Sequence, residues 1–202
     1  MRPALAAVLV LSTFALTAAQ PPKPVEPRYG VKHRDKAYPQ ATPKAALKSA
    51  LDAIDDADFP YLVAHIMDPK FVDGAVIDRQ KQLIPAVEGE LAQLRDFQRA
   101  NPERVDAENR VPLDPVQFRA AAAEKARERA FKQLVREVTA KLAEDAETLK
   151  ALRRLYREGT FTEGDPATVS HPDVKNRTLF FKKLGDRWVL ENRQVEEPKK
   201  EP

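Results

Sequence analysis

The feature that most constrains the fold is a long stretch without proline or glycine. After Pro115 neither residue recurs until Gly159. Apolar side chains recur there about every 3.5 residues, at Phe131, Val135, Val138, Leu142, Leu149, Leu152 and Tyr156. This spacing predicts a long amphipathic helix, with Asp114 as N-cap and Gly159 as its stop. Asp145 interrupts the stripe, so the helix either continues through it or begins anew with Asp145 as cap.

A second apolar stripe precedes this helix and predicts its packing partner. Ile84, Val87, Leu91 and Leu94 keep a three-four spacing, with Phe97 close by. They predict a helix over residues 78–100, which Pro85 either restarts or kinks. The two helices should form an antiparallel hairpin over residues 78–157. The alternative is an intermolecular coiled coil, which would require the stripe at residues 131–152 to be exposed in the monomer.

The last apolar segment reads as a β-hairpin. Residues 179–184 pair with residues 187–192 around Gly185 and Asp186, where glycine at the first loop position suits a type II′ turn. This register places Phe181 opposite Leu190 and Lys183 opposite Trp188. The face shared by Leu179, Phe181, Trp188 and Leu190 is the one that helices should cover. A strand at residues 167–170 brings the sheet, within residues 166–193, to about three strands.

Two shorter helices are predicted nearer the N-terminus. Thr42 caps the first, whose apolar stripe comprises Leu47, Ala50, Leu51 and Ile54. Asp58 caps the second, at residues 59–67, while residues 71–77 read as a loop or a short strand around Gly74. We therefore expect a predominantly helical α+β domain at residues 42–195. Its small antiparallel C-terminal sheet packs against the long helical hairpin and the two shorter helices.

The N-terminus has the pattern of a secretory signal peptide at residues 1–19, with a positive start, an apolar core and a small-residue cleavage site. The alternative is an uncleaved N-terminal anchor. Residues 20–41 read as a Pro-rich linker on which Tyr29 and Tyr38 are candidates for docking on the domain. Residues 196–202 read as a disordered charged tail. We expect an exported protein, periplasmic or secreted, without a stable membrane span after cleavage.

Composition excludes several kinds of chemistry. The chain has no cysteine, which excludes disulfides, thiol nucleophiles and Cys-ligated zinc. Its formal net charge is only +3, and acidic and basic residues alternate, so no nucleic-acid footprint is present. The sequence contains no Gly-rich phosphate loop, no Gly-x-Ser-x-Gly and no His-Glu-x-x-His motif. Asp55, Asp56 and Asp58 lack the alternation and glycine of a calcium loop. We therefore predict no metal and no cofactor.

His65 heads the candidate ligand-binding residues. It follows Tyr61 by four residues and precedes Asp68 by three, so the three lie on neighbouring helix faces and could orient a histidine for proton transfer. The alternative is a partly buried histidine satisfied by Asp68 or a backbone carbonyl. Trp188 either lines a pocket or packs against a helix. The candidate ligand-binding residues are Tyr61, His65, Phe181 and Trp188, and no catalytic residue is assigned.

Two segments resemble the SnoaL-like (nuclear-transport-factor-two-like) superfamily. Residues 42–58 resemble its opening amphipathic helix with a small-Asp step, and Phe180-Phe-Lys-Lys-Leu-Gly-Asp-Arg-Trp-Val-Leu190 resembles its closing strands. The resemblance implies a curved sheet wrapped around helices to form a cone with a cavity, in enzymes or in non-catalytic binding modules. The chain departs from the pattern at residues 78–157, where the family has strands. Either the long helices are an insertion or the fold is a different α+β fold.

These observations favour a non-catalytic envelope module that binds a protein partner or a small apolar ligand. The first alternative is a SnoaL-like enzyme in which His65 or Asp68 moves protons in a pocket floored by Trp188. The second is a helical oligomerisation or scaffold protein. The enzymatic alternative requires these side chains to converge on a cavity.

Overall fold

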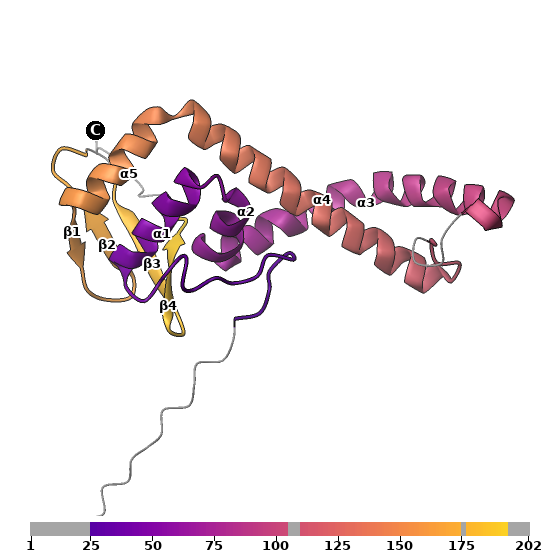
Figure 1. Cartoon of the computed structure of the whole chain (residues 1–202), viewed down its shortest axis with the longest axis horizontal. Helices are drawn as coiled ribbons and strands as arrows, with labels where there is room; N and C mark the ends of the chain where they lie inside the picture. The colour runs from indigo at the N-terminus through magenta and orange to yellow at the C-terminus, as the bar shows by residue number, and fades with distance from the viewer. Residues whose placement is uncertain (1–24, 105–109, 175–176, 194–202) are drawn as a thin grey trace, which may run out of the picture.

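The computed structural model of the chain describes residues 25–104, 110–174 and 177–193 (Figure 1). The predicted signal peptide and charged tail lie outside these residues. The elements are α1 (Pro43–Asp55), α2 (Phe59–Tyr61), the π-helix η1 (Leu62–Ile66), α3 (Pro69–Ala100), the 3₁₀ turn η2 (Pro102–Arg104), α4 (Pro115–Glu144), α5 (Ala146–Glu158), β1 (Thr160–Thr162), β2 (Ala167–Ser170), β3 (Leu179–Leu184) and β4 (Arg187–Glu191). The fold is α+β and predominantly helical, as predicted.

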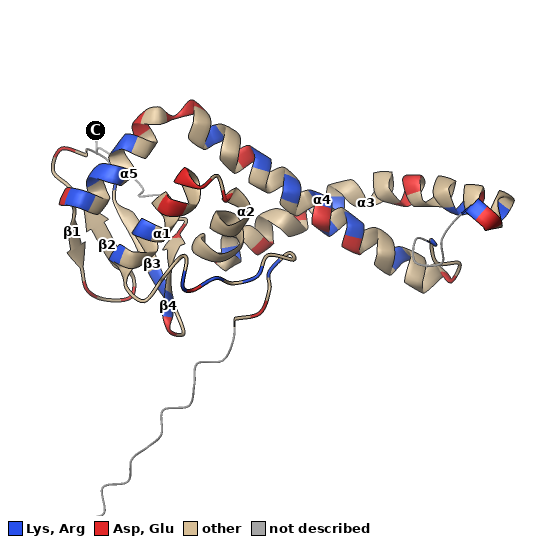
Figure 2. Ribbon diagram, in the orientation of Figure 1, with Lys and Arg blue, Asp and Glu red and all other residues tan. Residues whose placement is uncertain are grey.

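The molecule consists of a head and an arm (Figure 1). The head contains α1, α2, η1, α5 and the sheet, together with the adjoining ends of α3 and α4. The arm is the antiparallel hairpin that α3 and α4 form as they extend from the head. Its own apolar core joins Val87 and Leu91 of α3 to Ala122 and Ala126 of α4. Acidic and basic residues are interspersed along both parts (Figure 2).

The hairpin was predicted correctly in kind but not in its bounds. Helix α3 begins at Pro69, so residues 71–77 are helical and neither a loop nor a strand. Asp68 caps this helix through the backbone N–H of Lys70, and Pro69 takes the first helical position. Helix α4 ends at Glu144, because Asp145 caps a separate helix, α5, that returns to the head. The break at Asp145, left open by the sequence, is therefore present.

The sheet has four antiparallel strands in the order β1-β2-β3-β4. The predicted register is confirmed, with Phe181 opposite Leu190 and Lys183 opposite Trp188. Gly185 has a φ of +60°, as the first position of a type II′ turn requires. The sequence predicted about three strands and missed β1, because three residues are too few to show an alternating pattern.

Helices α1 and α5 pack against the sheet face that carries Phe181. Leu47 of α1 and Leu155 of α5 are fully buried in one cluster with Phe181, and Trp188 packs at its margin. The stripe of α4 also faces inward. Phe131 and Leu134 are buried against α3 and η1, and Val138 and Leu142 pack against other head residues. The exposed stripe that the oligomerisation alternative requires is absent from the described part of α4.

The described part of the predicted linker, residues 25–41, is packed on the domain and is not a free tether. Tyr29 stacks on Phe131 of α4, and Tyr38 is buried against Tyr61. At the other end of this segment, the Gln40 carbonyl accepts a 2.8 Å hydrogen bond from the Trp188 N–H and covers the outer edge of β4. The prolines prevented helix and strand, as expected, but aromatic contacts dock the segment.

Candidate functional site

The four candidate ligand-binding residues lie in the interior as two separate pairs. The rings of Tyr61 and His65 are adjacent, with centroids 5.0 Å apart, and both side chains are fully buried. Phe181, also fully buried, and the partly buried Trp188 belong to the cluster beneath α1 and α5. The four side chains therefore fill space as core residues. A ligand between the two pairs would have to displace them.

Gln40 connects the two pairs through their backbones. Its buried side-chain amide donates to the carbonyl oxygen of His65 at 3.0 Å and to that of Trp188 at 2.9 Å. Arg187 also donates to the His65 carbonyl at 3.3 Å. His65 lies in the last turn of η1, where carbonyl groups have no partner within the helix, so these donors satisfy its carbonyl and fix the backbone of residue 65.

The imidazole of His65 is held as a neutral ring. Its Nε2–H donates to the carbonyl oxygen of Val31 at 2.8 Å, while Nδ1 is buried and has no hydrogen-bond partner. Burial lowers the pKa of His65 to about 4, and the charges of His33 and Arg187 act in the same direction. Asp68, expected as a possible partner, instead caps α3. The backbone-carbonyl alternative is the one that the structure contains.

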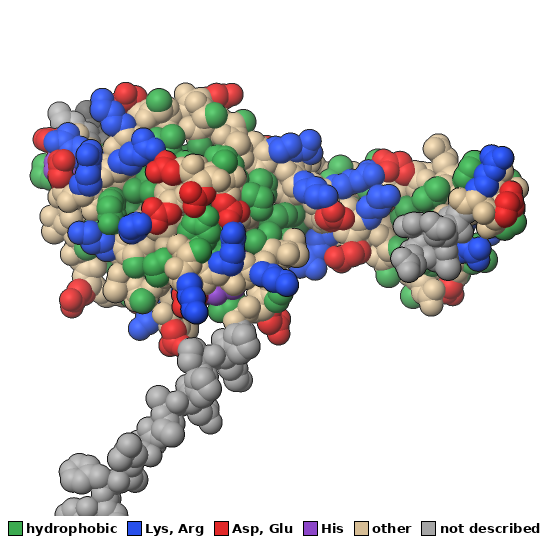
Figure 3. All heavy atoms as spheres, in the orientation of Figure 1, with side chains coloured by type: hydrophobic (Ala, Val, Ile, Leu, Met, Phe, Trp, Pro, Cys, Tyr) green, Lys and Arg blue, Asp and Glu red, His purple; other side chains and the backbone are tan. Residues whose placement is uncertain are grey.

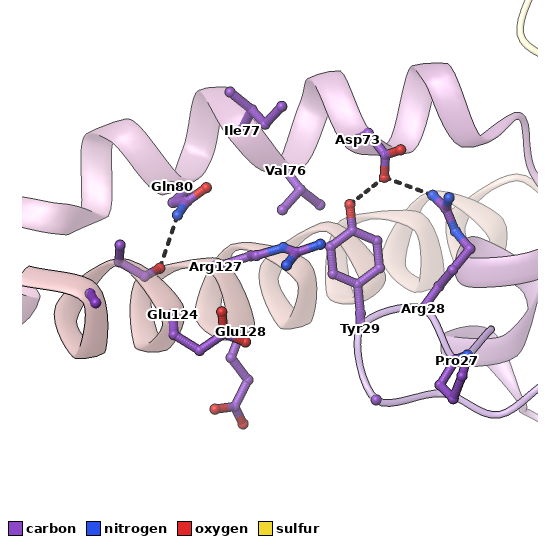
Figure 4. A pocket seen from close by; sticks show the side chains of 13 residues that line it. Pro27, Arg28, Tyr29, Asp73, Val76, Ile77, Gln80, Glu124, Arg127 and Glu128 are labelled. Atoms are coloured by element: carbon purple, nitrogen blue, oxygen red, sulfur yellow. Dashed lines mark hydrogen bonds and ion pairs between the residues drawn. The ribbon is translucent and has the colours of Figure 1, made fainter. Parts of the chain in front are cut away.

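A groove lies elsewhere, at the root of the arm (Figure 4). It runs between α3 and α4, is bordered by the N-terminal segment and has a volume of about 990 Å³. The residues that line it are Pro27, Arg28, Tyr29, Gly30, Asp73, Val76, Ile77, Gln80, Ala120, Ala123, Glu124, Arg127 and Glu128. This volume lies near the upper end of small-ligand sites. We call this region the arm-root groove.

Two polar connections fix the walls of the arm-root groove. The Asp73 carboxylate accepts from Arg28 at 2.7 Å and from the Tyr29 hydroxyl at 2.5 Å, which joins the N-terminal segment to α3. The Gln80 amide donates to the carbonyl of Ala123 at 2.9 Å, which joins α3 to α4. Side chains from three segments that are far apart in the sequence therefore meet in this groove (Figure 4).

Tyr29 organises the charges of the arm-root groove. Its ring stacks on Phe131, and the guanidinium of Arg127 lies over the ring, 5.1 Å from its centroid. Burial and the hydrogen bond to Asp73 raise the pKa of Tyr29 to about 12, so its hydroxyl remains protonated as a donor. Among the described residues, Arg127 has no carboxylate partner. The groove thus presents one unpaired cation beside a neutral aromatic ring.

A second surface feature lies at the far end of the arm. Leu94 and Phe97 lie near the end of α3, Leu113 precedes α4, and Val116 lies in the first turn of α4. All four side chains are exposed. Phe97 is 49% exposed and Val116 is 75% exposed. Hydrophobic atoms are visible at this end in Figure 3. We call these four residues the arm-end patch. The sequence placed Leu94 in the stripe that packs against the other helix of the hairpin, but its side chain is 39% exposed.

The comparisons with models of known families, with curated proteins and with solved structures found no match for this chain. Within the described residues, no group of three or more His, Asp or Glu side chains is placed to hold a metal ion. None of the helices in these same ranges is both long and apolar enough to cross a membrane.

Sequence reasoning missed the residues of the arm-root groove. Tyr29 was expected to dock, but nothing in the sequence showed that it would meet Asp73 and Arg127. Ala120 and Ala123, one turn apart on α4, were the available signal, because small residues on one helix face allow close approach. Asp73 lies in the segment left as loop or strand, so its helical face was not foreseen.

Proposed function

We propose that this chain is an exported, non-catalytic module of the cell envelope that binds a protein partner through the arm-end patch. The observation that carries this proposal is the distribution of exposed apolar side chains. Each large hydrophobic side chain that is exposed among the described residues belongs to the arm or its connection, and four of the five form the arm-end patch. The fifth, Ile77, lies beside the arm-root groove.

A patch of this kind is more stable when a partner covers it. Burying a large apolar side chain is favourable by about 1.5–3 kcal/mol, so a cluster left in water is a natural interface core. The arm holds the patch away from the head, where a partner can approach it from several sides. The mixed charges along the arm provide a polar rim of the kind that surrounds protein interfaces.

The interior supports a binding role at the surface rather than in a cavity. Tyr61, His65 and Phe181 have no solvent exposure, so the pocket that a SnoaL-like enzyme would place there is occupied by side chains. The unpaired Nδ1 of His65 lies inside this packing and is out of reach of a substrate. The exposed apolar side chains of the arm are therefore the better-supported binding surface.

Export is the part of the proposal that rests on residues 1–19. Fractionation of cells that produce the protein, followed by mass spectrometry of its N-terminus, tests it directly. We expect a mature chain that begins at Gln20 outside the cytoplasm. A full-length chain in the cytoplasm would contradict export while leaving the proposal for the arm-end patch open to its own test.

Site-specific photo-crosslinking tests the arm-end patch. A benzophenone side chain placed at Phe97 should crosslink a protein partner in producing cells. The same group at Lys150 on α5, whose side chain is 77% exposed, should not. The partner is then purified and titrated with the wild type and with a variant carrying Leu94→Ser, Phe97→Ser and Leu113→Ser. Loss of these contacts should weaken binding by about tenfold or more.

The matched control is Ile77→Ser, which removes an exposed apolar side chain from the same arm outside the patch. It should leave the affinity for the partner within about twofold. Equal crosslinking at positions 97 and 150, or equal binding by the triple variant, would reject the patch as an interface. Sedimentation of the wild type completes the design, because self-association that the triple variant abolishes would identify the partner as a second copy of the chain.

A further inference from the structure

We propose that the arm-root groove binds the carboxyl-terminal end of a polypeptide, with the terminal carboxylate held by Arg127. This site is distinct from the arm-end patch and does not depend on it. Three features of the groove carry this proposal: an arginine without an ion pair, the N-terminal segment that borders the groove, and the charges along its walls.

Arg127 differs from Arg79 and Arg129, two other arginines of the arm that reach across to the neighbouring helix. Arg79 pairs with Glu137 at 2.5 Å, and Arg129 pairs with Glu90 at 2.5 Å. Arg127 has no such partner among the described residues, and Tyr29 holds its guanidinium by a cation–π contact at 5.1 Å. The contact with the ring leaves N–H donors at the edge of the guanidinium. A planar carboxylate accepts two parallel hydrogen bonds from such a fork.

The groove is bordered at the Arg127 end by the N-terminal segment (Figure 4). The turn there is closed by paired backbone hydrogen bonds between Arg28 and Val31, at 3.0 and 2.9 Å. Its position is fixed by the contacts of Arg28 and Tyr29 with Asp73. A polypeptide that lies along the groove therefore meets a wall beside Arg127. This geometry favours a chain end over an internal segment.

Away from this wall, the groove suits a peptide ligand with an extended backbone and aliphatic side chains. Ala120, Ala123 and Arg127 follow one another along one face of α4, and Val76 and Gln80 face them from α3. The two alanines leave room for the ligand backbone, while Ile77, whose side chain is 47% exposed, supplies apolar contact. A volume of about 990 Å³ accommodates several residues.

The charges favour one carboxylate and disfavour an acidic peptide. Asp73, Glu124 and Glu128 line the groove together with Arg28 and Arg127. Arg28 is already paired with Asp73, and Glu128 is paired with Lys132. One cation therefore remains for the ligand, and additional ligand carboxylates would meet Glu124 and Glu128. A terminal carboxylate after apolar residues matches this arrangement.

Display of short random peptides with free carboxyl ends tests the proposal. Selection on the full wild-type chain should enrich sequences with aliphatic last residues. A selected peptide is then synthesised as the free acid and as the C-terminal amide, and both are titrated by calorimetry. The amide lacks the carboxylate that accepts charged hydrogen bonds from Arg127, so its affinity should be lower by a factor of about ten or more. Arg127→Gln should cause a loss of the same size for the free acid.

Arg129→Gln is the matched control, since it removes an arginine two residues away that points to Glu90 and lies outside the groove. It should leave the affinity within about twofold. The triple variant of the arm-end patch should also bind the peptide normally, which separates this proposal from the proposed function. No enrichment, equal enrichment on Arg127→Gln with unchanged thermal unfolding, or equal binding of acid and amide would overturn the assignment.

Discussion

The ring of Tyr29 lies flat against the ring of Phe131, with centroids 4.5 Å apart and planes 7° apart. This contact joins the N-terminal segment to the middle of α4. The Tyr29 hydroxyl extends the connection to α3 through Asp73. A stacked aromatic pair contributes about 0.5–1.5 kcal/mol beyond its buried area. Residues 25–41 are therefore a structural part of the domain.

Removing the Tyr29 ring should destabilise the whole domain. We expect Tyr29→Ala to lower the free energy of unfolding by about 2 kcal/mol, since it loses the stack and the buried area of a partly buried aromatic residue. Tyr29→Phe keeps the stack and should lose only about 1 kcal/mol with the hydroxyl. Urea unfolding followed by Trp188 fluorescence measures both. Equal stability of the alanine variant and the wild type would show that the segment is not docked.

The stability of the protein should fall as the pH falls below 6.5. Burial lowers the pKa of His65 to about 4, so the unfolded chain binds a proton more readily than the folded chain between pH 6.5 and about 4. The stabilisation from neutral His65 is thus complete above pH 6.5 and is lost progressively towards pH 4. For one proton the slope reaches about 1.4 kcal/mol per pH unit.

Urea unfolding at a series of pH values measures this slope in the wild type and in His65→Gln. The glutamine amide can still donate to the Val31 carbonyl but does not titrate. The ring centroids of His33 and His65 are 5.3 Å apart, and burial also lowers the pKa of His33. His33→Gln therefore serves as a companion variant. A slope that is unchanged in His65→Gln would assign the pH dependence to other groups.

Replacing the Gln40 amide should lower the free energy of unfolding even when the side-chain volume is kept. It is buried, and its amide satisfies the carbonyl oxygens of both His65 and Trp188. Gln40→Leu keeps a similar volume but leaves the Trp188 carbonyl without this donor, while Arg187 still reaches that of His65. We expect a loss of about 1–3 kcal/mol in unfolding free energy. A loss below about 0.5 kcal/mol would show that the interior is rearranged or hydrated at this point.

Local patterns in the sequence were sufficient for most of the fold. The turn at Gly185 and the pairing of Phe181 with Leu190 depend on neighbours across one hairpin, and both were predicted. The cap at Asp145 was one of two alternatives that the sequence left open, and it is present. The start of α3 was missed because Gly74 lowers helix propensity, whereas the cap at Asp68 and Pro69 determines where the helix begins.

The candidate site was less predictable because it depends on contacts between distant segments. Helical spacing placed Tyr61 beside His65, and their rings are adjacent. Spacing could not show that Val31 would satisfy His65 or that Gln40 would reach Trp188, which is 148 residues away in sequence. In the same way, an apolar stripe does not reveal where its partner ends, so Leu94 was assigned to the core although it is exposed.

Gly159, which connects α5 to β1, should tolerate a larger side chain poorly. A Cβ at Gly159 would overlap the carbonyl oxygen of Leu155 and lie 2.6 Å from a methyl carbon of Val169. Both neighbours belong to the packed core, and one of them is backbone. We therefore expect Gly159→Ala to lower the unfolding free energy by about 2 kcal/mol or more, through strain at the joint of helix and sheet.

Gly89→Ala is the opposite case and provides the matched control. Gly89 lies within α3, and a Cβ there would meet no atom within 4 Å. Alanine should raise the unfolding free energy by about 0.5–1 kcal/mol, because it restricts the unfolded chain and favours the helix. Thermal and urea unfolding of the two variants should thus shift in opposite directions from the wild type. A Gly159→Ala variant as stable as Gly89→Ala would mean that α5 and β2 are not packed as closely as described.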